Sequence, residues 1–254
     1  MKLRVLGCSG GIGGHLHTTS FLVDSDILID AGTGVGELAL AELATIDHIF
    51  ITHSHMDHIC NLPLLLDSIA GMRNRPVTVY ATEATLNILK RHIFNWEVWP
   101  DFSEIYRGLE TVMRYREIAT GETIALHGRR ITALPAVHTV PAVGYHLDSG
   151  NGSLVFSGDT YVNDALWEAV NRMENLRYLI VETAFSNREK ELAALSQHLC
   201  PSLLAGELKK LKKNAKIYIT HLKPDEAELI MAEIEDSAKP HDPEMLVNDQ
   251  VLEF

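Results

Sequence analysis

The sequence predicts an α/β fold in which two sheets pack face to face and helices cover their outer sides. Short apolar runs of strand length alternate with segments of helical periodicity, without repeats, low-complexity stretches or a linker. The strands fall into two runs separated by helices, which suits two packed sheets. Because a chain of 254 residues with 46% hydrophobic content can bury a sizeable core, we expect residues 1–254 to form a single domain.

Periodicity predicts the elements in chain order. In the first half we expect strands at Leu3–Gly7, Ser20–Val23, Asp26–Asp30, Asp47–Thr52 and Val77–Ala81, and helices at Gly34–Thr45, near Leu62–Ala70 and at Glu83–Phe94. In the second half we expect a helix near Asp164–Met173, further short strands including Tyr178–Glu182 and one ending at His221, and two helices that begin after Pro201 and Pro224.

The segment from Thr52 to His58, Thr-His-Ser-His-Met-Asp-His, contains the densest group of potential metal-binding side chains. It directly follows an apolar run, so it lies at the C-terminal end of a buried strand, where α/β sheets place their sites. His53 and His55 share strand parity, and both rings can converge on one metal ion. Asp57 and His58 lie beyond the turn and can reach a second ion. Imidazole and carboxylate groups are ligands for zinc, manganese and iron.

Three other apolar stretches end in a potential ligand. His138 follows Leu134–Val137, Asp159 follows Ser153–Gly158, and His221 follows Lys216–Thr220. Taken singly, each of these residues is as compatible with a satisfied polar side chain as with a ligand.

Taken together, the order HxHxDH, His, Asp, His resembles the signature of the metallo-β-lactamase fold. The resemblance implies a four-layer αββα sandwich with two divalent metal ions per chain, zinc first and manganese or iron as alternatives. It implies that His53, His55 and His138 bind one ion, that Asp57, His58 and His221 bind the other, and that Asp159 bridges both. No cysteine falls on a ligand position, and we expect Cys60 to pack.

Later segments resemble a smaller group of proteins, the class II cyclic-nucleotide phosphodiesterases. They are Val155–Thr160, Ile180–Asn187, Leu195–Pro201 and Tyr218–Pro224, together with His92–Asn95 and Trp99–Phe102. The resemblance spans almost the whole chain, from Ser20 to about Pro224. It implies hydrolysis of 3′,5′-cyclic nucleotides, cyclic AMP first, to 5′-monophosphates.

Two further residues have an expected catalytic role beside Asp57, which would orient the attacking hydroxide or take its proton. His198 is the best candidate to protonate the departing 3′-oxygen. By resemblance to ribonuclease Z, Glu182 would hold and charge that histidine. In the alternative interpretation, Glu182 is a satisfied strand-end carboxylate and His198 belongs to the start of the next helix.

Other conspicuous residues carry weaker expectations. Asn95, Trp96, Trp99 and Phe102 form either an aromatic wall for a purine or a packed loop. The basic run Lys209–Lys213 is expected to be a solvated face at a helix end. His15 and His17 lie in a glycine-rich loop, Ser9–His17, that could border the site.

Composition constrains the partners. The formal net charge of −12 is a poor match for long nucleic acid, whose binding depends on Lys and Arg contacts to phosphate. The chain lacks a run of about 18 apolar residues, so we expect no membrane partner, and its start lacks the pattern of a signal peptide. Three cysteines indicate reduced thiols and a cytoplasmic location. Relatives suggest a homodimer.

Two alternative functions remain at this level. A ribonuclease Z-like nuclease would use the same phosphodiester chemistry on a polymer, but no basic inserted arm is visible. A di-iron redox or oxygen-binding protein would share the fold, but such relatives usually have a carboxylate within the first motif, where this chain has His55.

Overall fold

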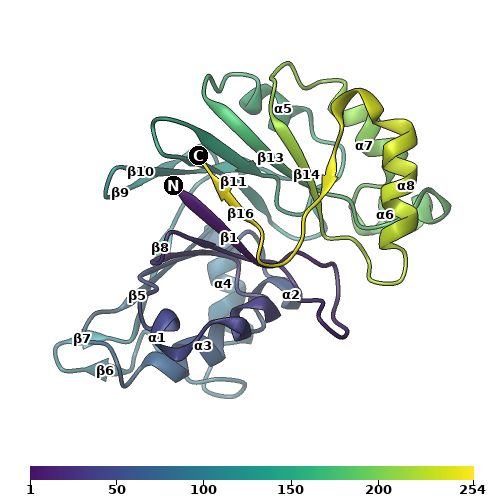
Figure 1. The fold of residues 1–254 in the computed structure, drawn as a ribbon. Coiled ribbons are helices and arrows are strands. Elements are labelled where there is room, and N and C mark those ends of the chain that lie inside the picture. Colours follow the sequence, from purple (N-terminus) through teal and green to yellow (C-terminus); the bar gives the residue numbers. More distant parts are fainter.

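The computed structural model describes residues 1–254 and contains two large mixed sheets of seven strands each (Figure 1). The first sheet has the order β16-β1-β2-β3-β4-β5-β8 and the second the order β15-β14-β13-β12-β11-β10-β9. The strands of the first sheet are β1 (Lys2–Gly7), β2 (Ser20–Val23), β3 (Ile27–Ile29), β4 (His48–Phe50), β5 (Val77–Ala81), β8 (Met113–Glu117) and β16 (Val251–Glu253). Those of the second are β9 (Thr123–Leu126), β10 (Arg129–Pro135), β11 (Val143–Asp148), β12 (Ser153–Phe156), β13 (Leu176–Glu182), β14 (Lys216–Thr220) and β15 (Glu244–Met245). A small hairpin joins β6 (Tyr106–Arg107) to β7 (Glu110–Thr111).

Helices lie on the outer side of each sheet (Figure 1). The first half contributes η1 (Thr33–Glu37), α1 (Leu40–Leu43), α2 (Met56–Ile59), α3 (Leu62–Ile69) and α4 (Glu83–His92). The second half contributes α5 (Asp164–Val170), η2 (Asn187–Glu189), α6 (Lys190–Ser196), α7 (Pro201–Leu208), α8 (Ala227–Ser237) and η3 (Lys239–His241). The predicted arrangement of two sheets between outer helices is confirmed.

Three hydrophobic clusters hold the four layers together. The middle one lies between the sheets and includes Phe21 and Phe50 from the first sheet and Tyr145 and Phe156 from the second. The Phe21 and Phe156 rings meet edge to face, with centroids 5.0 Å apart. The outer clusters join the first sheet to α3 and α4, and the second sheet to α5, α7 and α8.

Parallel strand pairing brings the candidate ligands to one edge of each sheet. The neighbours β3, β4, β5 and β8 run parallel, and so do β12, β13, β14 and β15. The carboxyl ends of parallel strands meet at the same edge of a sheet. Consequently the loops that follow β4, β12 and β14 carry His53, Asp159 and His221 to neighbouring positions.

Some elements differ from the sequence-based expectation. Residues 34–45 do not form one helix, because the backbone is extended at Leu38 and Ala39 between η1 and α1. Gly34 explains part of this path: a Cβ added there would lie 2.5 Å from the backbone of Leu6, so close packing on β1 positions the segment. The helices predicted at 83–94 and 164–173 end earlier, at His92 and Val170, and the helix after Pro224 begins at Ala227.

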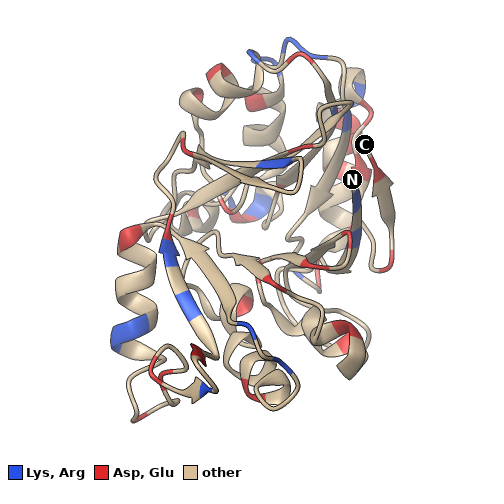
Figure 2. Ribbon diagram, turned by 90° about the vertical axis from the view of Figure 1, so that its left-hand side faces the viewer, with Lys and Arg blue, Asp and Glu red and all other residues tan.

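Basic and acidic residues alternate along the ribbon in Figure 2. None of the helices combines the length and the apolar character needed to cross a bilayer.

Candidate metal centre

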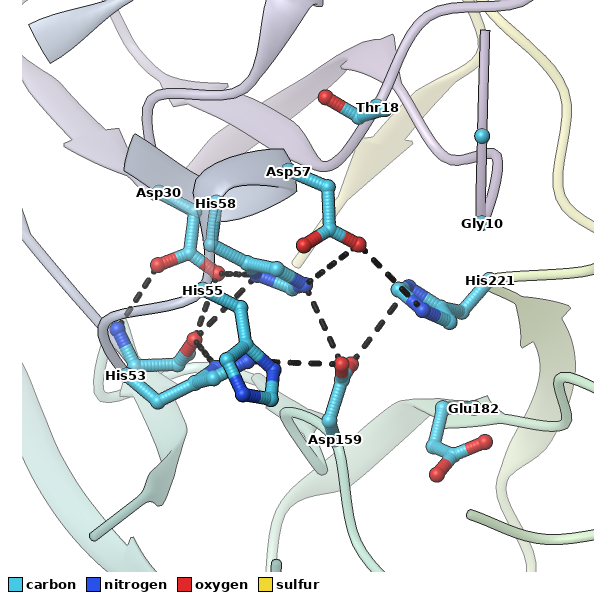
Figure 3. Close-up of polar contacts among 12 residues, drawn as sticks. Gly10, Thr18, Asp30, His53, His55, Asp57, His58, Asp159, Glu182 and His221 are labelled. Carbon is cyan, nitrogen blue, oxygen red and sulfur yellow. Dashed lines mark hydrogen bonds and ion pairs between the residues drawn. The ribbon is translucent and has the colours of Figure 1, made fainter. Parts of the chain in front are cut away.

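The HxHxDH segment begins where β4 ends and turns into α2. His55 is the extended residue that precedes α2, and Asp57 and His58 lie within that short helix. His53 and His58 are fully buried, whereas His55 and Asp57 are half-buried. The strand-to-helix turn thus gathers four side chains of one short segment near Asp159 (Figure 3).

The structure brings all seven predicted ligands together. Potential ligand atoms of His53, His55 and His138 lie within 4.8 Å of one another. The same holds for Asp57, His58 and His221. These are the two sets that the sequence pattern implied.

Asp159 lies between the two sets (Figure 3). Its Oδ2 is 3.6 Å from His53 Nε2 and 3.3 Å from His58 Nε2. Its Oδ1 is 3.5 Å from His221 Nδ1. Asp57 Oδ2 approaches the second set from the other side, 3.6 Å from His221 Nε2. A carboxylate in the position of Asp159 can serve both sets.

Unsatisfied polar atoms show that this donor set suits cations. His53 Nε2, His58 Nε2, Asp159 Oδ1 and His221 Nδ1 are buried without a hydrogen-bond partner. Such atoms are costly unless a ligand satisfies them. Imidazole nitrogen with carboxylate oxygen fits divalent zinc, manganese or iron.

The protonation states favour cation binding at most of the imidazoles. Burial lowers the pKa of His221 to about 3 and that of His138 to about 4. It also holds the pKa of His53 well below its usual range. These rings are therefore neutral near pH 7, and each has a lone pair available. His58 differs: burial alone would lower its pKa, but the Asp159 and Asp30 carboxylates raise it well above the usual value.

Asp30 is a buried residue of the candidate site that sequence reasoning missed. This fully buried residue follows β3 with a left-handed φ of 57°. Its carboxylate accepts hydrogen bonds from Thr52 N at 2.7 Å and Thr52 Oγ1 at 2.8 Å, and lies 2.7 Å from His58 Nδ1. It therefore holds the His58 ring with Nε2 towards the other ligands (Figure 3). An aspartate that ends the apolar run Ile27–Ile29 was a detectable signal.

Glu182 and His198 meet beside the two sets. Glu182 ends β13 and is fully buried, and its Oε1 lies 2.9 Å from His198 Nδ1. The backbone N–H of Thr160 also donates to Glu182 Oε1, at 3.1 Å. Burial alone would lower the pKa of His198, but the Glu182 carboxylate raises it above its usual value. The sequence-based pairing of these two residues is present in the geometry.

His198 lies close enough to the ligands to have two possible roles. Its ring centroid is 4.8 Å from that of His138 and 5.1 Å from that of His221. A ring nitrogen also falls in a third potential metal-binding group, with His138 and Asp159. Geometry alone therefore allows both a proton donor and an additional ligand at this position.

The aromatic-wall interpretation of residues 95–102 is wrong. Trp99 N donates to Ile93 O beyond the C-terminal end of α4, and Met113 N, at the start of β8, donates to Phe102 O. The loop thus lies at the amino ends of the parallel strands, opposite the ligand edge. Phe102 is buried in the core, and Trp96 is exposed. The alternative of a packed loop agrees with this position.

The glycine-rich loop does border the site through Gly10 (Figure 3). Gly10 N donates to Leu222 O at 2.9 Å, and a Cβ added at Gly10 would lie 2.4 Å from the carbonyl oxygen of His221. His17 instead faces Glu37, with 3.3 Å between Nε2 and Oε1, and His15 is exposed. Neither histidine joins the ligand sets.

Comparisons with known proteins agree with this arrangement. A probable 3′,5′-cyclic-nucleotide phosphodiesterase of Yersinia pestis is 26% identical over 240 residues, covering 83% of this chain and 65% of the relative. A 3′,5′-cyclic-nucleotide phosphodiesterase of Aliivibrio fischeri is 25% identical, covering 86% and 80% of the two chains. A ribonuclease Z of Staphylococcus epidermidis is 33% identical over a shorter region, 59% of this chain and 50% of the relative.

Solved structures show the same fold. Unliganded yeast PDE1 superposes with a TM-score of 0.84 at 18% identity, covering 100% of this chain and 99% of the other. The metallo-beta-lactamase fold protein YhfI from Bacillus subtilis gives a TM-score of 0.76, also at 18% identity, with 99% of each chain covered. The family model described as beta-lactamase superfamily domain matches residues 25–239. The chain therefore belongs to the beta-lactamase superfamily and has the metallo-β-lactamase fold.

Proposed function

We propose that this protein is a phosphodiesterase that hydrolyses 3′,5′-cyclic nucleotides, cyclic AMP first, to 5′-monophosphates with two divalent metal ions, zinc first. The observation that carries the proposal is the Glu182–His198 pair at 2.9 Å, next to the two potential ligand sets. A hydrolase with an alkoxide leaving group needs a proton donor close to its electrophilic centre. The names of the two phosphodiesterase relatives support the substrate class.

The candidate ligands would bind the two metal ions in two sets. His53, His55 and His138 would hold one ion, and Asp57, His58 and His221 the other, with Asp159 shared between them. When bound, such a pair of ions lowers the pKa of water and offsets the charge that develops on the phosphoryl oxygens. Asp30 would keep His58 oriented through its 2.7 Å contact with Nδ1.

Side chains of this protein would carry out the proton transfers. Asp57 is the more exposed of the two central carboxylates, so it can orient the attacking water or accept its proton. His198 faces Glu182 through Nδ1, which leaves Nε2 to donate to the departing 3′-oxygen. Glu182 is buried and fixed by the Thr160 N–H, so it positions the imidazole and stabilises its charged form.

Ribonuclease Z-like cleavage of RNA is a second candidate. It is favoured by the 33% identity to the Staphylococcus epidermidis enzyme. The formal net charge of −12 favours a small substrate instead, because binding of long nucleic acid depends on Lys and Arg contacts to phosphate.

A substrate panel tests the proposal. Protein reconstituted with zinc, manganese or iron would be incubated with cyclic AMP, cyclic GMP, 2′,3′-cyclic AMP, bis(p-nitrophenyl) phosphate and a precursor tRNA, and products would be separated chromatographically. We expect the highest kcat/KM for a 3′,5′-cyclic nucleotide, with a 5′-monophosphate as product. Cleavage of the tRNA without turnover of cyclic nucleotides would overturn the proposal in favour of the nuclease.

A further inference from the structure

Lys223 occupies a position beside the site to which none of the roles above applies. It follows His221 by two residues, in the loop after β14, and is half-buried. Its backbone N–H donates to Ala184 O at 3.1 Å, and its Nζ donates to Gly10 O at 2.8 Å. The side chain thus connects the loop after β14 with the glycine-rich loop.

The charge of Lys223 has no counter-ion within the chain. Lys223 forms no salt bridge, whereas Arg73 and Arg129, which are also partly buried, each contact an aspartate. An ammonium group can donate three hydrogen bonds, and the Gly10 carbonyl accepts only one. The other two donors of this partly buried ammonium group are therefore available to water or to a ligand with electronegative atoms.

The ammonium group of Lys223 and the proposed proton donor His198 both approach the Phe185 ring. Lys223 Nζ is 5.7 Å from the centroid of the Phe185 ring, and that ring is 5.8 Å from the His198 ring. Gly10, the acceptor of the Lys223 hydrogen bond, lies against His221. In a 3′,5′-cyclic nucleotide, the 2′-hydroxyl group is vicinal to the 3′-oxygen that leaves. If His198 faces the 3′-oxygen, a donor on the Phe185 side of His198 would be in a position to approach the 2′-hydroxyl group.

We propose that Lys223 is a specificity-determining residue that donates a hydrogen bond from Nζ to the 2′-hydroxyl oxygen of the substrate's ribose. This inference rests on the proposed cyclic-nucleotide phosphodiesterase function and deepens it. It identifies the substrates as ribonucleotides and assigns the selection against 2′-deoxyribonucleotides to one side chain.

The test compares cyclic AMP with 2′-deoxy-cyclic AMP in wild type and in Lys223→Met, both loaded with metal. Lys216→Met is the matched control, because Lys216 begins β14 at the end away from Lys223 and pairs with Glu244 at 3.0 Å. We expect Lys223→Met to raise KM for cyclic AMP by about 10- to 100-fold, the usual scale for a hydrogen bond from a charged group. We expect a less than about threefold change for 2′-deoxy-cyclic AMP. Lys216→Met should leave both values unchanged.

Each other outcome is decisive. Equal losses on both substrates, with metal content and melting temperature retained, would place the ammonium group on the phosphate and overturn the inference. Equal losses with a lower melting temperature would assign Lys223 to anchoring Gly10 and would also overturn it. In both cases wild-type turnover of cyclic AMP would leave the proposed function standing. No turnover of either nucleotide by wild type would instead overturn the proposed function, and the inference with it.

Discussion

Asp159 lies between the two potential ligand sets, and its two oxygens approach His53, His58 and His221. We expect Asp159→Ala to reduce metal content from about two ions per chain further than His221→Ala does, and to reduce activity further as well. Elemental analysis of reconstituted protein measures the first effect. The control is Asp236→Ala, an exposed aspartate of α8. If Asp159→Ala bound as much metal as wild type, the shared-ligand assignment would be wrong.

His198 has two possible roles, and the leaving group separates them. If it is the proton donor, His198→Ala should lower kcat on cyclic AMP by about 10²–10⁴-fold without loss of metal. Bis(p-nitrophenyl) phosphate should be much less affected, because p-nitrophenolate leaves without protonation. Glu182→Gln should follow the same pattern more mildly. His92→Ala, at the exposed end of α4, is the control.

Loss of metal from His198→Ala would identify the residue as a ligand of the group that includes His138 and Asp159. Equal losses on both substrates with metal retained would mean that His198 positions the phosphate.

The candidate site was predictable from single residues to the extent that four of the candidate ligands follow an apolar strand. His53, His138, Asp159 and His221 all satisfy this pattern. Asp30 satisfies it too, but its task depends on the 2.7 Å contact with His58, which is 28 residues away in the chain. The link from Lys223 to Gly10 crosses 213 residues. Periodicity describes only neighbours in sequence, so partners of this kind required the folded structure.

At the scale of elements, the strands were easier to predict than the helices. The strands that lead to the candidate ligands are mostly apolar and end one to three residues before them. The segment 34–45 has helical spacing, but packing of Gly34 against Leu6 outweighs that local preference. The loop at 95–102 illustrates a different limit. Its aromatic residues are evident in the sequence, but the direction of α4 decides at which end of the sheet they lie.

One ionic contact ties the two sheets together away from the site. Arg129 of β10 binds Asp26, in the turn between β2 and β3, with Nη1–Oδ1 and Nη2–Oδ2 distances of 2.6 and 2.7 Å. The hydrogen bond from Arg129 lowers the pKa of Asp26. Because the carboxylate form is favoured in the folded state, this stabilisation is present above the unfolded-state pKa of about 3.9 and disappears as pH falls through the lower folded-state pKa.

We therefore expect Arg129→Ala to lower the free energy of unfolding by about 1 kcal/mol at pH 7, and the difference from wild type to shrink as the pH falls below about 4. Urea unfolding of metal-free protein at several pH values measures it. Arg172→Ala removes an exposed pair with Glu168 and should have a smaller effect. A pH-independent difference would show that Arg129 acts through packing and not through its ion pair.

At the scale of the whole molecule, both sheets are required for the site. The loops after β3 and β4 of the first sheet carry Asp30 and the HxHxDH segment, and the loops after β10, β12 and β14 of the second carry His138, Asp159 and His221. The middle hydrophobic cluster holds these two groups in register. The four-layer arrangement was predictable because it follows from the order of strands and helices, whereas the distance between the two sets of loops follows from the packing of that cluster.

Because the ligands come from both layers, an ion bound among them would act as a cross-link between the sheets. Binding and unfolding are then linked equilibria, since the unfolded chain separates the HxHxDH segment from His221 by more than 160 residues. When the free ion concentration is about 100 times the dissociation constant, binding stabilises the folded state by about 2.7 kcal/mol. We expect chelation to lower the melting temperature and to increase amide exchange at the ligand-bearing ends of both sheets together. A calorimetric transition that chelator leaves unmoved would contradict this coupling.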